Sequence, residues 1–215
     1  MKEESSGGEL KPLKITCTST DCANNLHCFQ LTKKLLSQGP SGRCRSCGVQ
    51  LVEWSRVHKK DLSDVRYTLE ALRFELIRHH FWHVQLSERA INYARRKGKT
   101  ALRASAENQI GKLIGRAHHP REGQQTPRET TPRANAIHYA QHATASCCRR
   151  CAAEWHGIPE GRPLTGDEIS YLTELAMLYI NDRLPDLADG PSTVPKIRAA
   201  SEPKKHSLLE HAHAS

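Results

Sequence analysis

The chain has 215 residues and a formal net charge of +9, and 37% of its residues are hydrophobic but only 5% are aromatic. We therefore expect one medium domain or two small ones with a modest core. The sequence contains no apolar segment for export and no run long enough to span a bilayer, so we expect a cytoplasmic protein without a membrane partner.

The eight cysteines are the most informative part of the composition. In a reducing compartment, clustered cysteines indicate metal binding or catalysis more often than disulfides. Zinc is the metal that such clusters most often bind in proteins. We therefore expect at least one structural zinc site, and a second metal site where the cysteines cluster again.

The two ends of the chain are polar. Residues 1–13 contain two glycines and a proline, and residues 187–215 are rich in Pro, Ser, Ala and Lys, so we expect disordered tails. Between them the sequence predicts a zinc-ribbon-like module over residues 14–58 and a compact helical domain over residues 59–186. The predicted fold class is mainly α with a small N-terminal β zinc ribbon.

Two close cysteine pairs mark the first module, and the second pair is followed by Gly48. Paired knuckles of this kind are typical of a structural zinc site, although the first pair encloses four residues rather than the commoner two. Alternating residues over 26–31 and 49–54 predict two short strands. The expected zinc ligands are Cys17, Cys22, Cys44 and Cys47, with Cys28 or His27 as substitutes if Cys17 or Cys22 points away.

Residues 61–84 carry the clearest helical pattern, with apolar residues in alternating steps of three and four from Leu62 to Leu76. The same count continues to His79 and His83. Two imidazoles on a core-facing side could share a metal or act as hydrogen-bond donor and general base. Either histidine alone is more often a hydrogen-bonded core residue.

Residues 87–133 contain eleven Lys and Arg but four Asp and Glu, and so carry a net charge of +7. A basic segment of this kind predicts binding to nucleic acid, either DNA or RNA. The alternative is a basic surface that contacts only water. Two helices, 87–97 and 100–114, each ended by glycine, would expose cations where they meet. The expected phosphate contacts are Arg95, Arg96, Lys97, Lys99 and Arg103, with Arg149 and Arg150 further along the chain.

The sequence Gly98-Lys99-Thr100 resembles the end of a phosphate-binding loop. The earlier glycine of that motif is replaced by Tyr93, and no strand precedes it, so we reject a nucleoside triphosphatase. Residues 117–133 contain three prolines and form a basic loop or lid. Near the C-terminus, Thr165 and Glu168 predict a capping box for a last helix that ends before Pro185.

Cysteines and histidines cluster again over residues 138–156, where Ser146 and Gly157 would begin and end one short helix. The positive end of a helix lowers thiol pKa, and the thiolate is the form that binds metal or attacks. The alternative is that small cysteines fill a seam between helices. The expected ligands of a second metal site are His142, Cys147, Cys148 and Cys151.

The residues from Gln141 to Ala145, the three cysteines that follow and the Trp155-His156-Gly157-Ile158-Pro159 run form one long signature, preceded by Gln125-Thr126-Pro127. In these residues the chain resembles a bacterial family known as a domain of unknown function, over about residues 87–184. The resemblance implies that His142, the three cysteines, Trp155 and His156 belong to one unit. It implies no reaction.

Three functions of different classes remain open. The first is a zinc protein acting on nucleic acid, with a hydrolytic or base-processing site at the second cluster. Its catalytic residues would be His79, His83, His142 and His156. The second is a non-enzymatic, zinc-stabilised module that binds nucleic acid or protein, and the third is a cysteine redox sensor.

Two known nuclease and deaminase patterns fit poorly. Zinc base deaminases carry a His-x-Glu before the cysteine pair, and this chain does not. A ββα-metal nuclease would need an Asp-His pair where the chain has Val57-His58. We expect His79 and His83 to face the same cavity as His142, Cys148 and Cys151, because the inward stripe of the helix over residues 61–84 ends in these two imidazoles.

Overall fold

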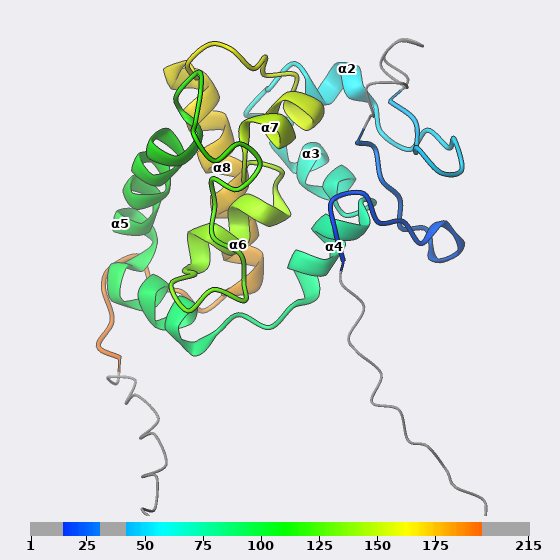
Figure 1. The fold of residues 1–215 in the computed structure, drawn as a ribbon. Helices are drawn as coiled ribbons and strands as arrows, with labels where there is room; N and C mark the ends of the chain where they lie inside the picture. The colour runs from blue at the N-terminus through cyan, green and yellow to red at the C-terminus, as the bar shows by residue number, and fades with distance from the viewer. Residues whose placement is uncertain (1–14, 31–41, 195–215) are drawn as a thin grey trace, which may run out of the picture.

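The computed structural model describes residues 15–30 and 42–194. The described residues form seven α-helices, one short 3₁₀ helix and no β-strand (Figure 1). These elements are η1 (Cys22–Asn24), α2 (Trp54–Val57), α3 (Val65–Leu72), α4 (Leu76–His83), α5 (Glu88–Ile114), α6 (Ala136–Ala143), α7 (Arg149–His156) and α8 (Gly166–Arg183). The predicted tail 1–13 and residues 195–215 of the other predicted tail lie outside the described residues.

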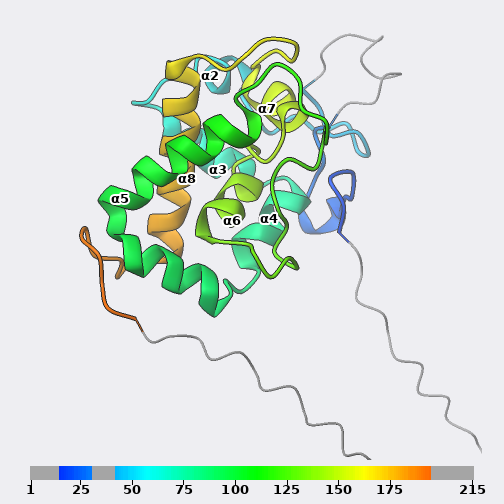
Figure 2. The ribbon, with the colours of Figure 1, turned by 60° about the vertical axis from the view of Figure 1, so that its left-hand side comes forward.

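Helix α8 lies at the centre of the helical domain and packs against α3, α5 and α6, while α4 packs against α6 (Figures 1 and 2). Leu172, Ala176 and Tyr179 of this helix are fully buried. The predicted capping box is confirmed. Glu168 N–H donates to Thr165 Oγ1 at 3.2 Å, and Thr165 N–H donates to Glu168 Oε2 at 2.9 Å.

Helix α5 consists of the two predicted helices joined at a kink, which Figure 2 shows as a bend. Gly98 has φ 67° and ψ 168°, a backbone conformation available almost only to glycine. A Cβ atom there would lie 2.3 Å from the backbone of Gly190, so the close approach of the two segments also requires glycine.

The helix predicted over residues 61–84 is broken into α3 and α4, so the prediction of one continuous helix is wrong. At the break, His27 N–H donates to the Phe74 carbonyl at 2.7 Å, and Leu76 N–H donates to the His27 carbonyl at 2.9 Å. The N-terminal segment thus takes backbone groups that a continuous helix would use. Steps of three and four residues counted from α3 therefore predict the wrong buried face for α4, because the two helices are not continuous.

The β strands of the predicted zinc ribbon are not observed in residues 15–30 and 42–58, whereas the mainly helical class is confirmed. Only isolated bridges occur, between Asp21 and Leu26 and between His27 and Glu75. Helix α2 begins at Trp54, at the end of the second predicted strand. Residue 31, the last of the first predicted strand, lies outside the described residues.

A second, smaller core joins the N-terminal segment to α7. Its centre is a set of three aromatic rings from Phe29, Trp54 and Trp155. The Phe29 ring lies 5.7 Å from each tryptophan ring, and the two tryptophan rings are 5.1 Å apart. Aromatic pairs at these spacings stabilise beyond the area that they bury. This core also contains the cysteines of the second cluster.

Candidate metal centres

Four side chains of the N-terminal segment form a group that could bind a metal ion, and we call it the first centre: Cys22, His27, Cys44 and Cys47. Their ligand atoms all lie within 4.8 Å of one another. The sulfurs of Cys22 and Cys44 are 3.8 Å apart, and His27 Nδ1 lies 3.4 Å from the Cys47 sulfur. Three thiols and one imidazole are a common structural metal site.

Short turns bring these ligands together. Asp21 and Leu26 exchange two backbone hydrogen bonds of 2.7 and 3.0 Å, which enclose Cys22 in a tight turn. Cys44 N–H donates to the Val49 carbonyl at 2.8 Å and so closes the turn that carries the second cysteine pair. Burial raises the pKa of Cys44, but backbone hydrogen bonds outweigh it and lower that pKa to about 6. The thiolate, which binds metal, is therefore favoured at neutral pH.

His27 takes the place in this centre that the spacing had given to Cys17. Its Nε2–H donates to Asn25 Oδ1 at 3.0 Å, which holds the ring with Nδ1 toward Cys47. Metal-binding histidines characteristically donate their other N–H to such an acceptor. The spacing of the cysteines favours Cys17 as the partner of Cys22. That spacing cannot show that Asn25 holds the His27 ring in position to replace it.

The second group that could bind a metal consists of Cys147, Cys148 and Cys151, and we call these three residues the second centre. All three thiols are buried, with exposures of 5, 4 and 3%. The Cys147 and Cys151 sulfurs are 3.6 Å apart, and Cys151 N–H donates to the Cys148 sulfur at 3.4 Å. Helix α7 begins after Cys148 rather than after Ser146, so Cys148 itself caps the helix.

Arg78 of α4 lies against these thiols and is itself buried. Its guanidinium donates to the Cys151 sulfur at 3.2 Å and lies 3.8 Å from that of Cys147. Burial disfavours the charged form of Arg78, but the Cys151 thiolate and the Glu75 carboxylate outweigh it and raise its pKa. Arg78 therefore remains a cation and offsets the negative charge of a thiolate group.

Glu75 connects the second centre to the N-terminal segment. Its carboxylate accepts from Arg78 Nε at 2.9 Å and from Trp155 Nε1 at 2.7 Å. The backbone N–H of Phe29 donates to its other oxygen at 3.4 Å. No motif in the sequence predicted a role for Glu75 or Arg78. A signal was present, because they are the two opposite charges, three residues apart, in the apolar run 74–82.

Cys17 belongs to the surroundings of the second centre rather than the first. A hydrogen bond between its thiol and Cys151 is the main cause that raises the pKa of Cys17, and burial adds to it. Hydrogen bonds from Cys147, Cys148 and Cys17 hold the pKa of Cys151 well below its usual range. Cys17 therefore lies beside Cys151, although its sulfur is not among the three that all lie within 4.8 Å of one another.

The histidines expected near the second cluster have other partners. His142 donates from Nε2 to the Pro127 carbonyl at 3.2 Å, and its ring stacks on Phe81 at 4.5 Å. It is therefore outside the group of ligand atoms, contrary to the predicted ligand set. His156 is fully buried and donates to the Thr144 carbonyl at 2.9 Å. Burial lowers the pKa of both to about 4, so both rings are neutral at pH 7.

His79 and His83 do not face the cysteines. His83 is exposed, its Nδ1–H donates to the His79 carbonyl at 2.8 Å, and the two rings stack 4.0 Å apart. On the same helix it is Arg78 that contacts the thiols of Cys147 and Cys151, so these contacts give no support to the expected shared cavity. No contact among the described residues joins either histidine to a thiol.

The expected phosphate contacts differ in exposure and in whether a carboxylate pairs with them. Arg95 and Arg96 are exposed beside the kink of α5, and no carboxylate among the described residues pairs with them. Arg103 pairs with Glu174, and Lys99 lies 4.0 Å from Asp189. Arg149 is fully buried and donates to backbone carbonyls, so it is removed from the predicted contacts.

Of the remaining two predicted contacts, Arg150 is exposed but pairs with Glu154 at 3.1 Å. Lys97 is half-buried, and its Nζ lies 5.3 Å from the centre of the Tyr93 ring. Both cations remain on the surface, so both stay compatible with a polyanion contact.

Comparison with known families assigns the helical domain. A family model described as a domain of unknown function (DUF4186) matches residues 66–181. The chain belongs to this family. The matched region starts within α3, earlier than the predicted start near residue 87, and so includes Arg78 together with Cys147, Cys148 and Cys151. Cys17 and the first centre lie outside it. No solved structure matches the chain.

None of the helices in the described residues is both long and apolar enough to cross a membrane.

Proposed function

We propose that this protein is a zinc-stabilised nucleic-acid-binding module, in which two zinc centres hold the N-terminal segment on the helical domain and residues 87–133 contact the polyanion. The observation that carries the proposal is the presence of two separate groups of metal-ligand atoms, each within 4.8 Å. A fold with few aromatic residues gains stability from such cross-links, because metal binding adds directly to the folding free energy.

The ligand types and spacings favour zinc. Thiolates with one imidazole suit zinc better than magnesium or calcium, which prefer oxygen ligands. In a tetrahedral site with zinc–sulfur bonds of about 2.3 Å, neighbouring sulfurs are about 3.8 Å apart. The sulfur pairs here are 3.8 Å apart in the first centre and 3.6 Å in the second. We assign Cys17, which lies beside Cys151, as the fourth ligand of the second centre; its sulfur is outside the group of three within 4.8 Å and would move toward them when zinc binds.

This ligand set supports a structural rather than a hydrolytic role for the second centre. A catalytic zinc keeps one position open for water or substrate, whereas four thiols fill a tetrahedral site. The three cysteines of α7 and its start are at most 5% exposed, so a polymer would not reach them without rearrangement. The same burial disfavours a redox sensor, since reactive cysteines are partly exposed.

The kink of α5 supports the nucleic-acid part of the proposal. Gly98 turns the chain so that Arg95 and Arg96 stand exposed next to it. Unpaired exposed cations contact phosphates without first losing an ion pair. The basic loop 117–133 follows the same helix, and Arg116, Arg121 and Arg133 are exposed as well.

Metal analysis tests the first part of the proposal. Protein purified from zinc-containing medium and analysed by plasma mass spectrometry should hold two zinc ions per chain, and a chelator that removes them should lower the melting temperature. One zinc would remove one of the two centres from the proposal. A zinc-free protein with an unchanged melting temperature would overturn the structural role of both.

Salt-dependent binding tests the second part. Fluorescence anisotropy with labelled single- and double-stranded DNA and RNA should show affinity that falls steeply with salt. The variant Arg95→Gln/Arg96→Gln should lower the salt slope by about two. The control Lys59→Gln/Lys60→Gln removes the same charge beyond α2 and should leave the slope unchanged. Equal effects of the two variants would show that net charge alone drives binding.

A further inference from the structure

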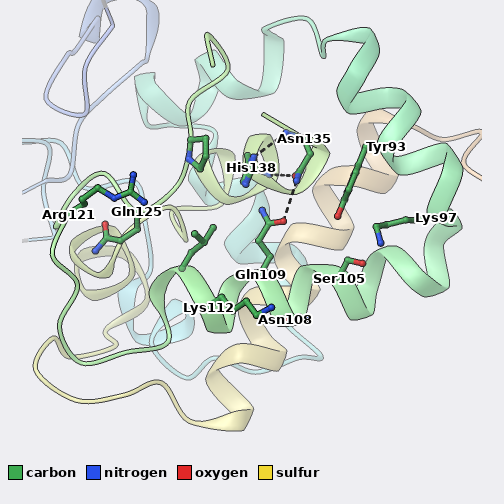
Figure 3. A pocket seen from close by; sticks show the side chains of 12 residues that line it. Tyr93, Lys97, Ser105, Asn108, Gln109, Lys112, Arg121, Gln125, Asn135 and His138 are labelled. Atoms are coloured by element: carbon green, nitrogen blue, oxygen red, sulfur yellow. Dashed lines mark hydrogen bonds between the residues drawn. The ribbon is translucent and has the colours of Figure 1, made fainter. Parts of the chain in front are cut away.

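A polar groove lies between α5, the loop 117–133 and the start of α6, away from both metal centres. Its volume is about 490 Å³, within the range of pockets that bind small molecules. Figure 3 shows side chains from all three elements around it, with Tyr93 at one end and Arg121 at the other. Neither metal centre nor any predicted catalytic histidine contributes to it.

The charge of the groove is positive. Lys97, Lys112 and Arg121 line it, and none of the described residues that line it is Asp or Glu. No carboxylate among the described residues pairs with these three cations. Glu122, which does not line the groove, accepts from Gln125 Nε2 at 2.9 Å. Three unpaired cations on a concave surface attract an anion more strongly than the same cations on a flat one.

Amide groups form a second part of the wall. Asn135 Nδ2 donates to Gln109 Oε1 at 3.3 Å, which leaves Gln109 Nε2 as a buried donor without a partner (Figure 3). Gln125 is 1% exposed, and its Oε1 is a buried acceptor without a partner. A donor and an acceptor left unpaired at one groove destabilise the free protein. Both side chains line the groove, so a small rotation of each amide would offer this donor and this acceptor to a ligand with hydrogen-bonding edges of both kinds.

His138 adds a donor whose state is fixed. Its Nδ1 accepts from the Asn135 backbone N–H at 3.1 Å in the capping box of α6. Burial lowers the pKa of His138 to about 4, so the ring is neutral at pH 7 and its proton sits on Nε2. At the other end of the groove, the half-buried Tyr93 ring supplies an aromatic surface beside Lys97.

We infer that this groove binds a nucleoside phosphate. The cations suit the phosphate, the amides suit the donors and acceptors of a base edge, and Tyr93 suits stacking by the base. A free phosphate or sulfate would use only the cations and leave the amide wall and the ring without a role. The inference deepens the proposed function, because the nucleoside phosphate could be a free nucleotide or one nucleotide of a bound strand.

The test uses the full chain with its metals and measures binding of the four nucleoside monophosphates by calorimetry and by NMR titration. At least one should bind and shift the amide signals of Gln109, Gln125 and Asn135. Lys112→Gln and Tyr93→Leu should each weaken it by about tenfold or more, since they remove a phosphate contact and a stacking surface. The control Lys59→Gln removes an exposed cation outside both the groove and residues 87–133 and should change affinity less than twofold.

Inorganic phosphate and labelled oligonucleotides form the other two arms. Inorganic phosphate that binds as tightly as every monophosphate, with Tyr93→Leu having no effect, would reduce the groove to a simple anion site and overturn the inference. Absence of any monophosphate binding at millimolar concentration, together with oligonucleotide binding that Lys112→Gln and Tyr93→Leu leave unchanged, would also overturn it.

The two arms separate the proposals. Monophosphate binding without oligonucleotide binding would support the groove as a free-nucleotide site and contradict the proposed nucleic-acid function. Oligonucleotide binding that the groove variants weaken, with no binding of monophosphates, would place the nucleotide within a strand and support both.

Discussion

The two metal centres are built from the same residue types in opposite ways. The first centre takes its ligands from local turns, and although His27 and Cys44 are buried, Cys47 remains exposed and Cys22 is partly exposed. The second is buried under α4 and α7, and its charge is offset by Arg78. A thiolate group at the surface is stabilised by water, whereas a buried one needs a cation from the fold. The second centre therefore depends on tertiary structure, and the tertiary structure should depend on it.

The largest expected effect is the difference in stability between a variant that loses one ligand of the second centre and a variant that loses one ligand of the first. Cys151→Ser removes the thiol that contacts the other three, within the core, so we expect a loss of more than about 5 kcal/mol in unfolding free energy. Cys47→Ser should release one metal but leave the helical domain folded. Metal analysis and circular dichroism melting would measure both. A folded Cys151→Ser protein with two metals would contradict the distinction.

Arg78→Met tests whether the buried cation balances the second centre. The substitution leaves Glu75 and the thiolates buried without their counter-charge, so we expect a loss of about 3–5 kcal/mol in unfolding free energy. Arg150→Met is the control, because that side chain is 56% exposed in its pair with Glu154 and should cost less than about 1 kcal/mol. Denaturant unfolding with metal present would compare them.

A double variant sharpens this result. Glu75→Gln together with Arg78→Met removes both charges of the buried pair, and should be more stable than the sum of the two single losses allows. Additive losses would mean that Arg78 acts through packing alone. In that case the charge argument for the second centre would fail, even though the single variant is destabilised.

The sequence predicts what local rules determine. The capping box at Thr165, the glycine kink at residue 98 and the helix end at Gly157 all follow from a few adjacent residues, and all are observed. The family resemblance likewise depends on adjacent residues and is confirmed. Each of these features involves backbone conformations that one or two residue types adopt most easily.

The remaining features depend on contacts between distant segments. The helical count through residues 61–84 does not show that His27 pairs with the backbone on both sides of Glu75 and so ends α3. Cysteine spacing does not show that Cys17 lies by Cys151. In both cases a tertiary contact overrides a local pattern, and the N-terminal segment supplies it.

Cys17→Ser tests whether the second centre takes a fourth ligand from the N-terminal segment. Loss of a fourth thiol should weaken metal binding there by about a hundredfold, or about 2.7 kcal/mol, because three thiols remain. Cys28→Ser is the control, because Cys28 belongs to neither group of ligand atoms and its thiol donates to the Cys17 carbonyl at 3.2 Å. Competition with a zinc chelator would measure both. Loss of metal from the first centre in Cys17→Ser would restore the ligand set predicted from spacing.

The smallest expected effect concerns the orientation of one ligand in the first centre. Asn25 accepts from His27 Nε2 and has φ 59°, so Asn25→Gly keeps the left-handed backbone but removes the acceptor. Removing a partner of this kind lowers metal affinity by about tenfold, since the ring is no longer held with Nδ1 toward the metal. Chelator competition should show this loss at the first centre alone. Equal weakening of both centres would mean that they are coupled through the backbone of His27 and Glu75. Unchanged affinity at both would mean that the bonds of the His27 backbone to residues 74 and 76 already orient its ring.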